Sequence, residues 1–124
     1  MPAAIVRRTD TGFVVQIEVP YADSMLDAED AILAALNEAG VAATEEALGR
    51  FDADGAPIRP GPMNLTSMGK VRKQYQTPYG VATIERHVYQ GPKGGPTHCP
   101  LDRDARIVVS STSRFARMIA HKYA

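Results

Sequence analysis

The sequence predicts a small α+β domain in which an antiparallel sheet is covered by one helix. Three patterns lead to this prediction: an alternating segment over residues 13–19, a helical apolar stripe over 24–39, and two β-rich segments, 70–76 and 81–89, that flank a tight turn. The order of strands and helices does not alternate regularly, which argues against an α/β sheet. A length of 124 residues suits one compact domain.

The first strand is predicted over residues 13–19. Val15, Ile17 and Val19 alternate with polar side chains, and Pro20 ends the strand because proline donates no ladder hydrogen bond. Residues 6–8 are expected to pair with it across a turn. We expect this strand to lie in the same sheet as the segments 70–76 and 81–89.

The clearest helix is predicted over residues 24–39. Ser24 suits the N-cap position, Asp27 suits the capping-box position, and Gly40 is expected to end the helix. The acidic residues that complement the positive end of the helix dipole are Asp27, Glu29 and Asp30. The apolar stripe is expected to pack into the core and contains positions 25, 28, 32, 35, 36 and 39. A second, shorter helix is predicted from Thr44 to near Gly49.

A turn and a stiff connector follow over residues 51–69. Asp52 to Gly55 has the composition of a turn, and three prolines then favour an extended chain. The turn is similar to the start of a calcium-binding loop, but Met63 stands where such a loop requires an acidic residue. No calcium site is therefore expected.

The segments 70–76 and 81–89 predict a β-hairpin whose tight turn is Thr77-Pro78-Tyr79-Gly80. Basic and aromatic side chains are interleaved along the hairpin, as in surfaces that follow a phosphate backbone and stack on bases. The same pattern also suits a solvated sheet face on which lysine protects an edge. The sequence leaves both interpretations open.

Residues 91–100 predict a flexible loop that contains the single cysteine, Cys99. One cysteine excludes an internal disulfide. A structural zinc ion needs about four nitrogen or sulfur ligands, and His98 and Cys99 have no Cys-x-x-Cys partner. Cys99 also lacks a histidine at an informative spacing, so we expect no metal, no cofactor and no enzymatic activity.

The C-terminal part predicts a short turn or helix over residues 102–107 and a basic amphipathic helix after residues 111–113. No residue typical of a helix end follows the last turn, which favours a longer natural protein.

Charge is unevenly distributed along the chain. Residues 1–62 have a net charge of −7 and residues 63–124 a net charge of +7. This polarity favours contact with a polyanion, or else mutual attraction of the two halves. We divide the single domain into an acidic strand–helix part (1–50), a Pro/Gly-rich connector (51–69) and a basic part with the hairpin, loop and last helix (70–124).

Three segments together resemble a known family. They are residues 51–58 (FDADGAPI), residues 75–90 (YQTPYGVATIERHVYQ), and a third group formed by CPLD at 99–102, ARI at 105–107, SRFA at 113–116 and HKYA at 121–124. In this order they are similar to the N-terminal region of ISKra-type insertion-sequence transposases. The resemblance covers roughly residues 45–124 and is most specific in the hairpin and the Cys-Pro-Leu-Asp stretch.

The resemblance implies a non-catalytic module, because the catalytic part of that family is a later RNase-H-like domain with metal-binding acidic residues. Nothing in this chain matches that domain, so the Asp52/Asp54 and Asp102/Asp104 pairs are not expected to be metal ligands. Some relatives have a Cys-x-x-Cys element before the Leu-Asp stretch, of which this chain keeps only Cys99.

The leading hypothesis is a module or truncated product of an insertion-sequence transposase that binds DNA or assists transposase assembly. The candidate nucleic-acid contacts are Lys70, Arg72, Lys73, Arg86, Lys93, Arg114, Arg117 and Lys122. The alternative is a free-standing protein-binding inhibitor or adaptor, for example an anti-CRISPR-like protein, whose acidic face would contain Asp27, Glu29, Asp30, Glu45 and Glu46.

A cytoplasmic protein is expected, because the chain has no signal-peptide core and no apolar run near the roughly 20 residues that cross a bilayer. Exposed hairpin edges and the uncapped last helix favour a homodimer.

Overall fold

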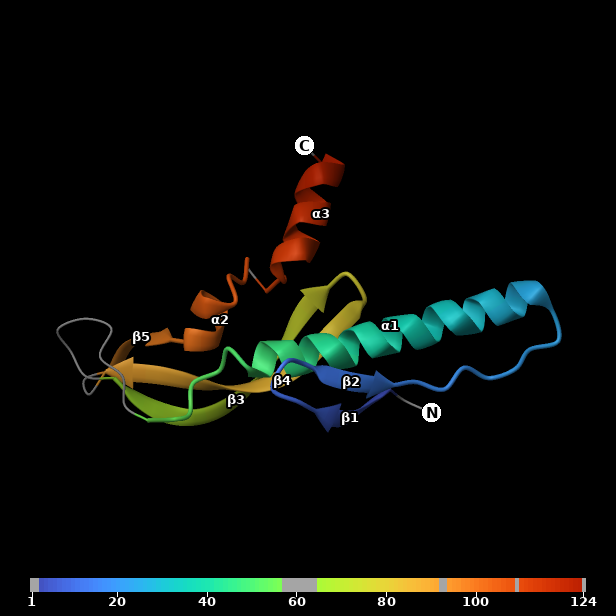
Figure 1. Ribbon diagram of the computed structural model, residues 1–124. Helices are drawn as coiled ribbons and strands as arrows, with labels where there is room; N and C mark the ends of the chain where they lie inside the picture. The colour runs from blue at the N-terminus through green and yellow to red at the C-terminus, as the bar shows by residue number, and fades with distance from the viewer. Residues whose placement is uncertain (1–2, 57–64, 92–93, 109, 124) are drawn as a thin grey trace.

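The computed structural model describes residues 3–56, 65–91, 94–108 and 110–123, apart from the side chains of residues 91, 94–96 and 121–123. In chain order the elements are β1 (Ala4–Arg8), β2 (Phe13–Gln16), α1 (Met25–Gly49), β3 (Thr66–Thr77), β4 (Gly80–Gly91), β5 (Gly94–His98), α2 (Pro100–Asp104) and α3 (Ser113–Tyr123). Helices and antiparallel strands are mixed without alternation, so the protein belongs to the predicted α+β class (Figure 1).

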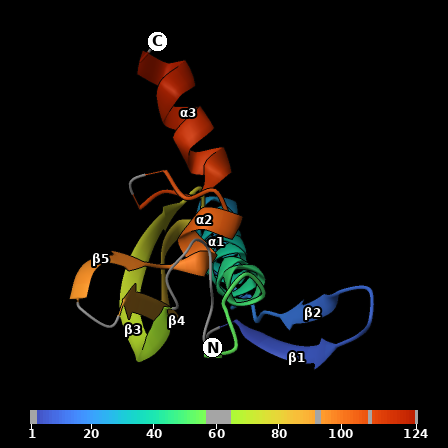
Figure 2. The ribbon, with the colours of Figure 1, turned by 90° about the vertical axis from the view of Figure 1, so that its left-hand side faces the viewer.

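The strands form two separate sheets, β1–β2 and β3–β4–β5. The expectation that residues 13–19 share a sheet with the long hairpin is therefore wrong. Viewed nearly along its axis, α1 lies between the two sheets, with β1 and β2 on one side and β3 and β4 on the other (Figure 2). Because α1 contacts both hairpins, it separates strands that would otherwise be free to pair.

The helix α1 is longer than predicted. Ser24 is its N-cap, as expected, and its hydroxyl accepts the amide of Asp27 at 3.1 Å. The helix then continues through Gly40 to Gly49, which joins the two predicted helices into one. A Cβ atom at position 40 would overlap the ring of Tyr79 and lie 2.7 Å from its Cβ atom. Gly40 therefore marks a close approach of the hairpin to the helix, not a helix end.

The predicted hairpin is confirmed and extends over β3 and β4. Its turn is Pro78-Tyr79, where the hydroxyl of Thr77 donates to the carbonyl of Gly80 at 2.6 Å. Gly80 has a φ of +140°, a backbone conformation that favours glycine. Within the expected loop 91–100, residues 94–98 instead form β5, which pairs with the end of β4.

The core lies where the C-terminal end of α1, the hairpin and α2 meet. It contains Leu48, Tyr75, Ile84 and Leu101, with Cys99 among the half-buried residues packed against them. The N-terminal half of α1 and the whole of α3 extend away from this core in different directions (Figure 1).

The predicted core stripe of α1 is mostly outside the core, which corrects the sequence-based expectation. Ala35 is buried, but Met25 is 66% exposed and Leu36 is 54% exposed. Ala35 and its neighbour Ala31 line a shallow pocket with Glu18 and Pro20 of the preceding segment. Alanines allow that extended segment to approach, so the large apolar side chains face away from it.

Candidate functional site

Arg86 was a candidate nucleic-acid contact, but the structure places it inside the protein. Its side chain is on the inward face of β4, and the residue is 9% exposed. Its Nε donates to the Tyr75 hydroxyl at 2.9 Å and its Nη1 donates to the Val71 carbonyl at 3.1 Å. Arg86 is therefore a structural residue that a phosphate does not reach.

Lys73 is also engaged within the protein. Its Nζ lies 3.7 Å from Oδ2 of Asp102 and 5.4 Å from the centroid of the Tyr75 ring. A cation already paired with a carboxylate attracts an external phosphate less strongly. Lys73 is accordingly a weaker candidate than its neighbours on β3.

Four of the candidate cations are exposed. Lys70 and Arg72 lie on the outward face of β3, and Arg114 and Arg117 lie on α3. Among the described residues, none of the four takes part in an ion pair, although Glu85 stands opposite Arg72 in the β3–β4 register. The two remaining candidates, Lys93 and the side chain of Lys122, lie outside the described residues.

Tyr75 links Arg86 to Asp102 in a polar network at the edge of the core. The Tyr75 hydroxyl accepts from Arg86 and donates to Oδ1 of Asp102 at 2.5 Å. Burial, followed by the hydrogen bond to Asp102, raises the pKa of the Tyr75 phenol. The phenol therefore stays neutral and bridges the two charges, which joins the hairpin to α2.

The part of the β4 edge that β5 does not pair with is closed by carboxylates. Oε2 of Glu45 accepts the Thr83 amide at 2.7 Å, and Oδ1 of Asp52 accepts the His87 amide at 2.9 Å. Oδ2 of Asp52 also lies 3.0 Å from Nδ1 of His87. These bonds satisfy edge amides that would otherwise attract another strand.

The aspartates of the 52–56 turn and Cys99 were considered as metal ligands or as a nucleophile. In residues 52–56, the Asp52 and Asp54 side chains accept amides of their own turn. Burial raises the pKa of the Cys99 thiol, so its reactive thiolate form is disfavoured. Over the part of the chain that the structure describes, no group of three His, Cys, Asp or Glu residues is placed to hold a metal ion.

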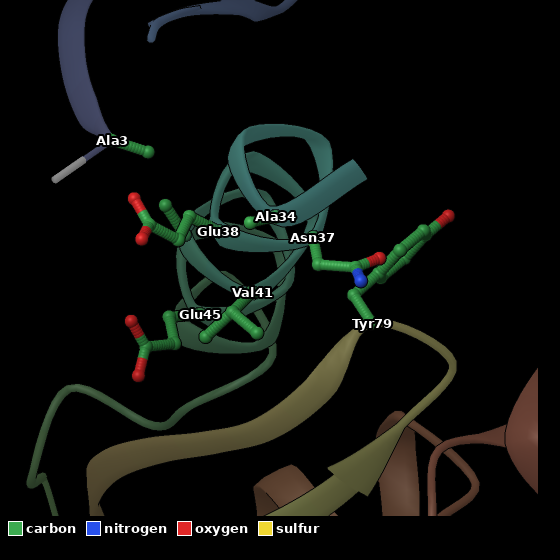
Figure 3. A pocket seen from close by; sticks show the side chains of 8 residues that line it. Ala3, Ala34, Asn37, Glu38, Val41, Glu45 and Tyr79 are labelled. Atoms are coloured by element: carbon green, nitrogen blue, oxygen red, sulfur yellow. The ribbon is translucent and has the colours of Figure 1, made fainter. Parts of the chain in front are cut away.

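A shallow groove beside α1 is the subject of Figure 3. Glu38 and Glu45 extend from α1 on the side where Ala3 lies, whereas Asn37 and Tyr79 lie on the other side (Figure 3). Its described lining contains two carboxylates, one amide and one phenol, and the other lining residues are small or aliphatic.

The five acidic candidates separate into two groups. Glu45 accepts the Thr83 amide at the β4 edge. Glu46 pairs with Arg8, whose hydrogen bonds lower the pKa of the Glu46 carboxyl. Asp27, Glu29 and Asp30 instead lie exposed on the N-terminal half of α1. The acidic face predicted from the sequence is thus reduced to these three residues.

An exposed apolar surface on α1 was not predicted. We define the α1 apolar surface as the exposed side chains of Met25, Leu26, Ile32, Leu33 and Leu36. At 100° per residue these positions fall within one side of the helix, and Glu29 lies among them. The signal in the sequence was the pair of apolar doublets, 25–26 and 32–33, seven residues apart, opposite a side rich in alanine.

In comparisons with known proteins, no protein-family model, no curated protein and no solved structure matches the chain. Across the described residues, no helix combines the length and the apolar character that crossing a membrane requires.

Proposed function

We propose that this chain is a non-catalytic N-terminal module of an ISKra-type insertion-sequence transposase, which binds DNA or assists assembly of the transposase. One observation supports the proposal: the three segments that resemble the family contact one another. Asp52 of the first segment bonds to His87 of the second, and Tyr75 of the second bonds to Asp102 of the third. The residues of the resemblance therefore belong to one folded unit.

DNA binding is assigned to the outward face of β3. Lys70 and Arg72 are two residues apart and point to the same side of the strand, next to the exposed Gln74 and Gln76. Cations that contact phosphates release counterions, so the affinity should fall as salt concentration rises. Amide side chains beside them are suitable hydrogen-bond donors to phosphate oxygens.

The double variant Lys70→Ala/Arg72→Ala tests this assignment. We expect its affinity for a labelled DNA duplex, measured by fluorescence anisotropy, to fall about tenfold because two phosphate contacts are lost. Between roughly 50 and 200 mM salt, the slope of log affinity against log salt should decrease by about 2.

The matched control is Arg7→Ala/Arg50→Ala, which removes two exposed cations from the acidic half of the chain. This control should bind DNA like the wild type. Equal losses in both double variants, or no binding by the wild type at low salt, would contradict the DNA-binding proposal.

A second candidate function is a free-standing protein-binding inhibitor or adaptor, for example an anti-CRISPR-like protein. The observation that favours it is the exposed acidic and apolar side of α1, which lies in residues 1–44, outside the segments of the resemblance. Inhibition of a CRISPR nuclease in a cleavage assay, lost in the variant Asp27→Asn/Glu29→Gln/Asp30→Asn, would support this function. A wild-type chain without effect on such nucleases would contradict the anti-CRISPR example.

A further inference from the structure

The α1 apolar surface is too exposed for a helix packed only within its own chain. Leu26 is 70% exposed, Leu33 is 59% exposed and Met25 is 66% exposed. From Met25 to Leu36 the surface extends along about 16 Å of helix at 1.5 Å per residue. Contiguous exposed apolar side chains of this kind mark contact surfaces.

The charged residues that α1 itself places at this surface are acidic. Glu29 lies within it and Asp30 lies at its border, whereas no lysine or arginine occurs between residues 9 and 49. A matching partner should therefore present apolar side chains together with positive charge.

The helix α3 has these properties. Met118 is 48% exposed and Ile119 is 41% exposed, and Arg114 and Arg117 are exposed near them. No acidic residue follows Asp104 in the sequence. With 11 residues, α3 is also about 16 Å long, which equals the extent of the α1 apolar surface.

The α3 helix does not run along the N-terminal half of α1 of the same chain (Figures 1 and 2). Two backbone bonds hold the start of α3 at the hairpin: the Gln76 amide donates to Ser110 at 2.7 Å, and the Thr112 amide donates to Gln76 at 2.9 Å. From this anchor α3 extends away from the sheets, while the N-terminal half of α1 extends in another direction (Figures 1 and 2).

We propose that α3 of one chain docks on the α1 apolar surface of a second copy, and that the contact is reciprocal in a two-fold dimer. Apolar side chains meet apolar side chains, and Arg114 and Arg117 face Glu29 and Asp30 of the other copy. A two-fold interface makes the same contact twice, which doubles the buried surface. The inference rests on the assembly role in the proposed function. Because Arg114 and Arg117 take part in the dimer contact, Lys70 and Arg72 remain as the proposed DNA-binding cations.

Charge reversal provides the test, with mass measured by light scattering after gel filtration. We expect the wild type to elute with twice the 13.4 kDa mass of the chain. Glu29→Lys/Asp30→Lys and Arg114→Glu/Arg117→Glu should each be monomeric, because like charges then face each other. A mixture of the two variants should form the dimer again, because both contacts between the two chains become complementary.

Leu33→Asp tests the apolar part of the contact and should also give a monomer. Val81→Asp, at another exposed apolar position, is the control and should stay dimeric. Circular dichroism verifies that each variant is folded. A monomeric wild type, dimeric charge-reversal variants, or a mixture that stays monomeric would each overturn the proposed dimer.

The DNA measurement separates this inference from the proposed function. A monomeric wild type that binds DNA through Lys70 and Arg72 overturns the dimer but supports the DNA-binding module. A dimeric wild type that binds no DNA supports the dimer and contradicts the DNA-binding role.

Discussion

Replacing Tyr75 with phenylalanine is expected to lower the free energy of unfolding by about 3 kcal/mol. The hydroxyl bridges Arg86 and Asp102. Its loss leaves the buried guanidinium with the Val71 carbonyl as its hydrogen-bond partner among the described residues. A buried charge that loses a hydrogen-bond partner is destabilising because no water replaces it. Urea unfolding followed by circular dichroism measures the change.

The control for this variant is Tyr79→Phe. Tyr79 is 45% exposed and its hydroxyl forms no hydrogen bond with the residues that the structure describes, so its removal should change stability little. If the two variants lost equal stability, the bridging role of Tyr75 would be refuted.

Stability should also decrease in alkaline solution. Burial raises the pKa values of Cys99, Tyr75 and Tyr89, whose ordinary values are 9.0, 10.0 and 10.0. The unfolded chain then loses these protons at lower pH than the folded protein, so the free energy of unfolding falls as pH rises above these values. Tyr75→Phe should show a smaller fall over this range.

Gly40→Ala is expected to destabilise the protein by about 2 kcal/mol, although alanine is the better helix former. The new Cβ atom would overlap the ring of Tyr79, so the hairpin tip must move away from α1. Thermal and urea unfolding measure the loss of stability.

Gly49→Ala is the matched control, because nothing lies within 4 Å of a Cβ atom there. It should increase stability by about 0.5 kcal/mol through the lower entropy of the unfolded chain. In a Tyr79→Gly background, which removes the Cβ atom as well as the ring, Gly40→Ala should no longer destabilise. If it still did, the overlap with Tyr79 would not be its cause.

The elements with local signals were predictable from the sequence. The Thr77–Gly80 turn, the two strands beside it and the Ser24 cap depend on neighbouring residues, and the structure contains all three. The continuity of α1 through Gly40 was not predictable in this way. It depends on Tyr79, which is 39 positions further along the chain, and a helix-ending glycine has the same local sequence.

The candidate DNA contacts also divide into those that the local sequence predicts correctly and those that depend on distant residues. Lys70 and Arg72 were predicted to be exposed on a basic hairpin, and they are. Arg86 belongs to the same pattern, yet its position on β4 faces the core, where Tyr75 and Asp102 surround it. Met25, Ile32 and Leu36 of the α1 apolar surface were assigned to the core because periodicity identifies an apolar side without identifying what covers it.

Because α1 is unbroken from Met25 to Gly49, its outer half behaves as a rigid lever fixed to the hairpin at Gly40. A molecule bound near Met25 would be held at one angle to β3, with no hinge to absorb rotation. A rotation of the outer end of α1 would be transmitted through the continuous helix to Leu48 in the core. Lengthening α1 by one residue would turn the bound molecule by about 100° around the lever axis.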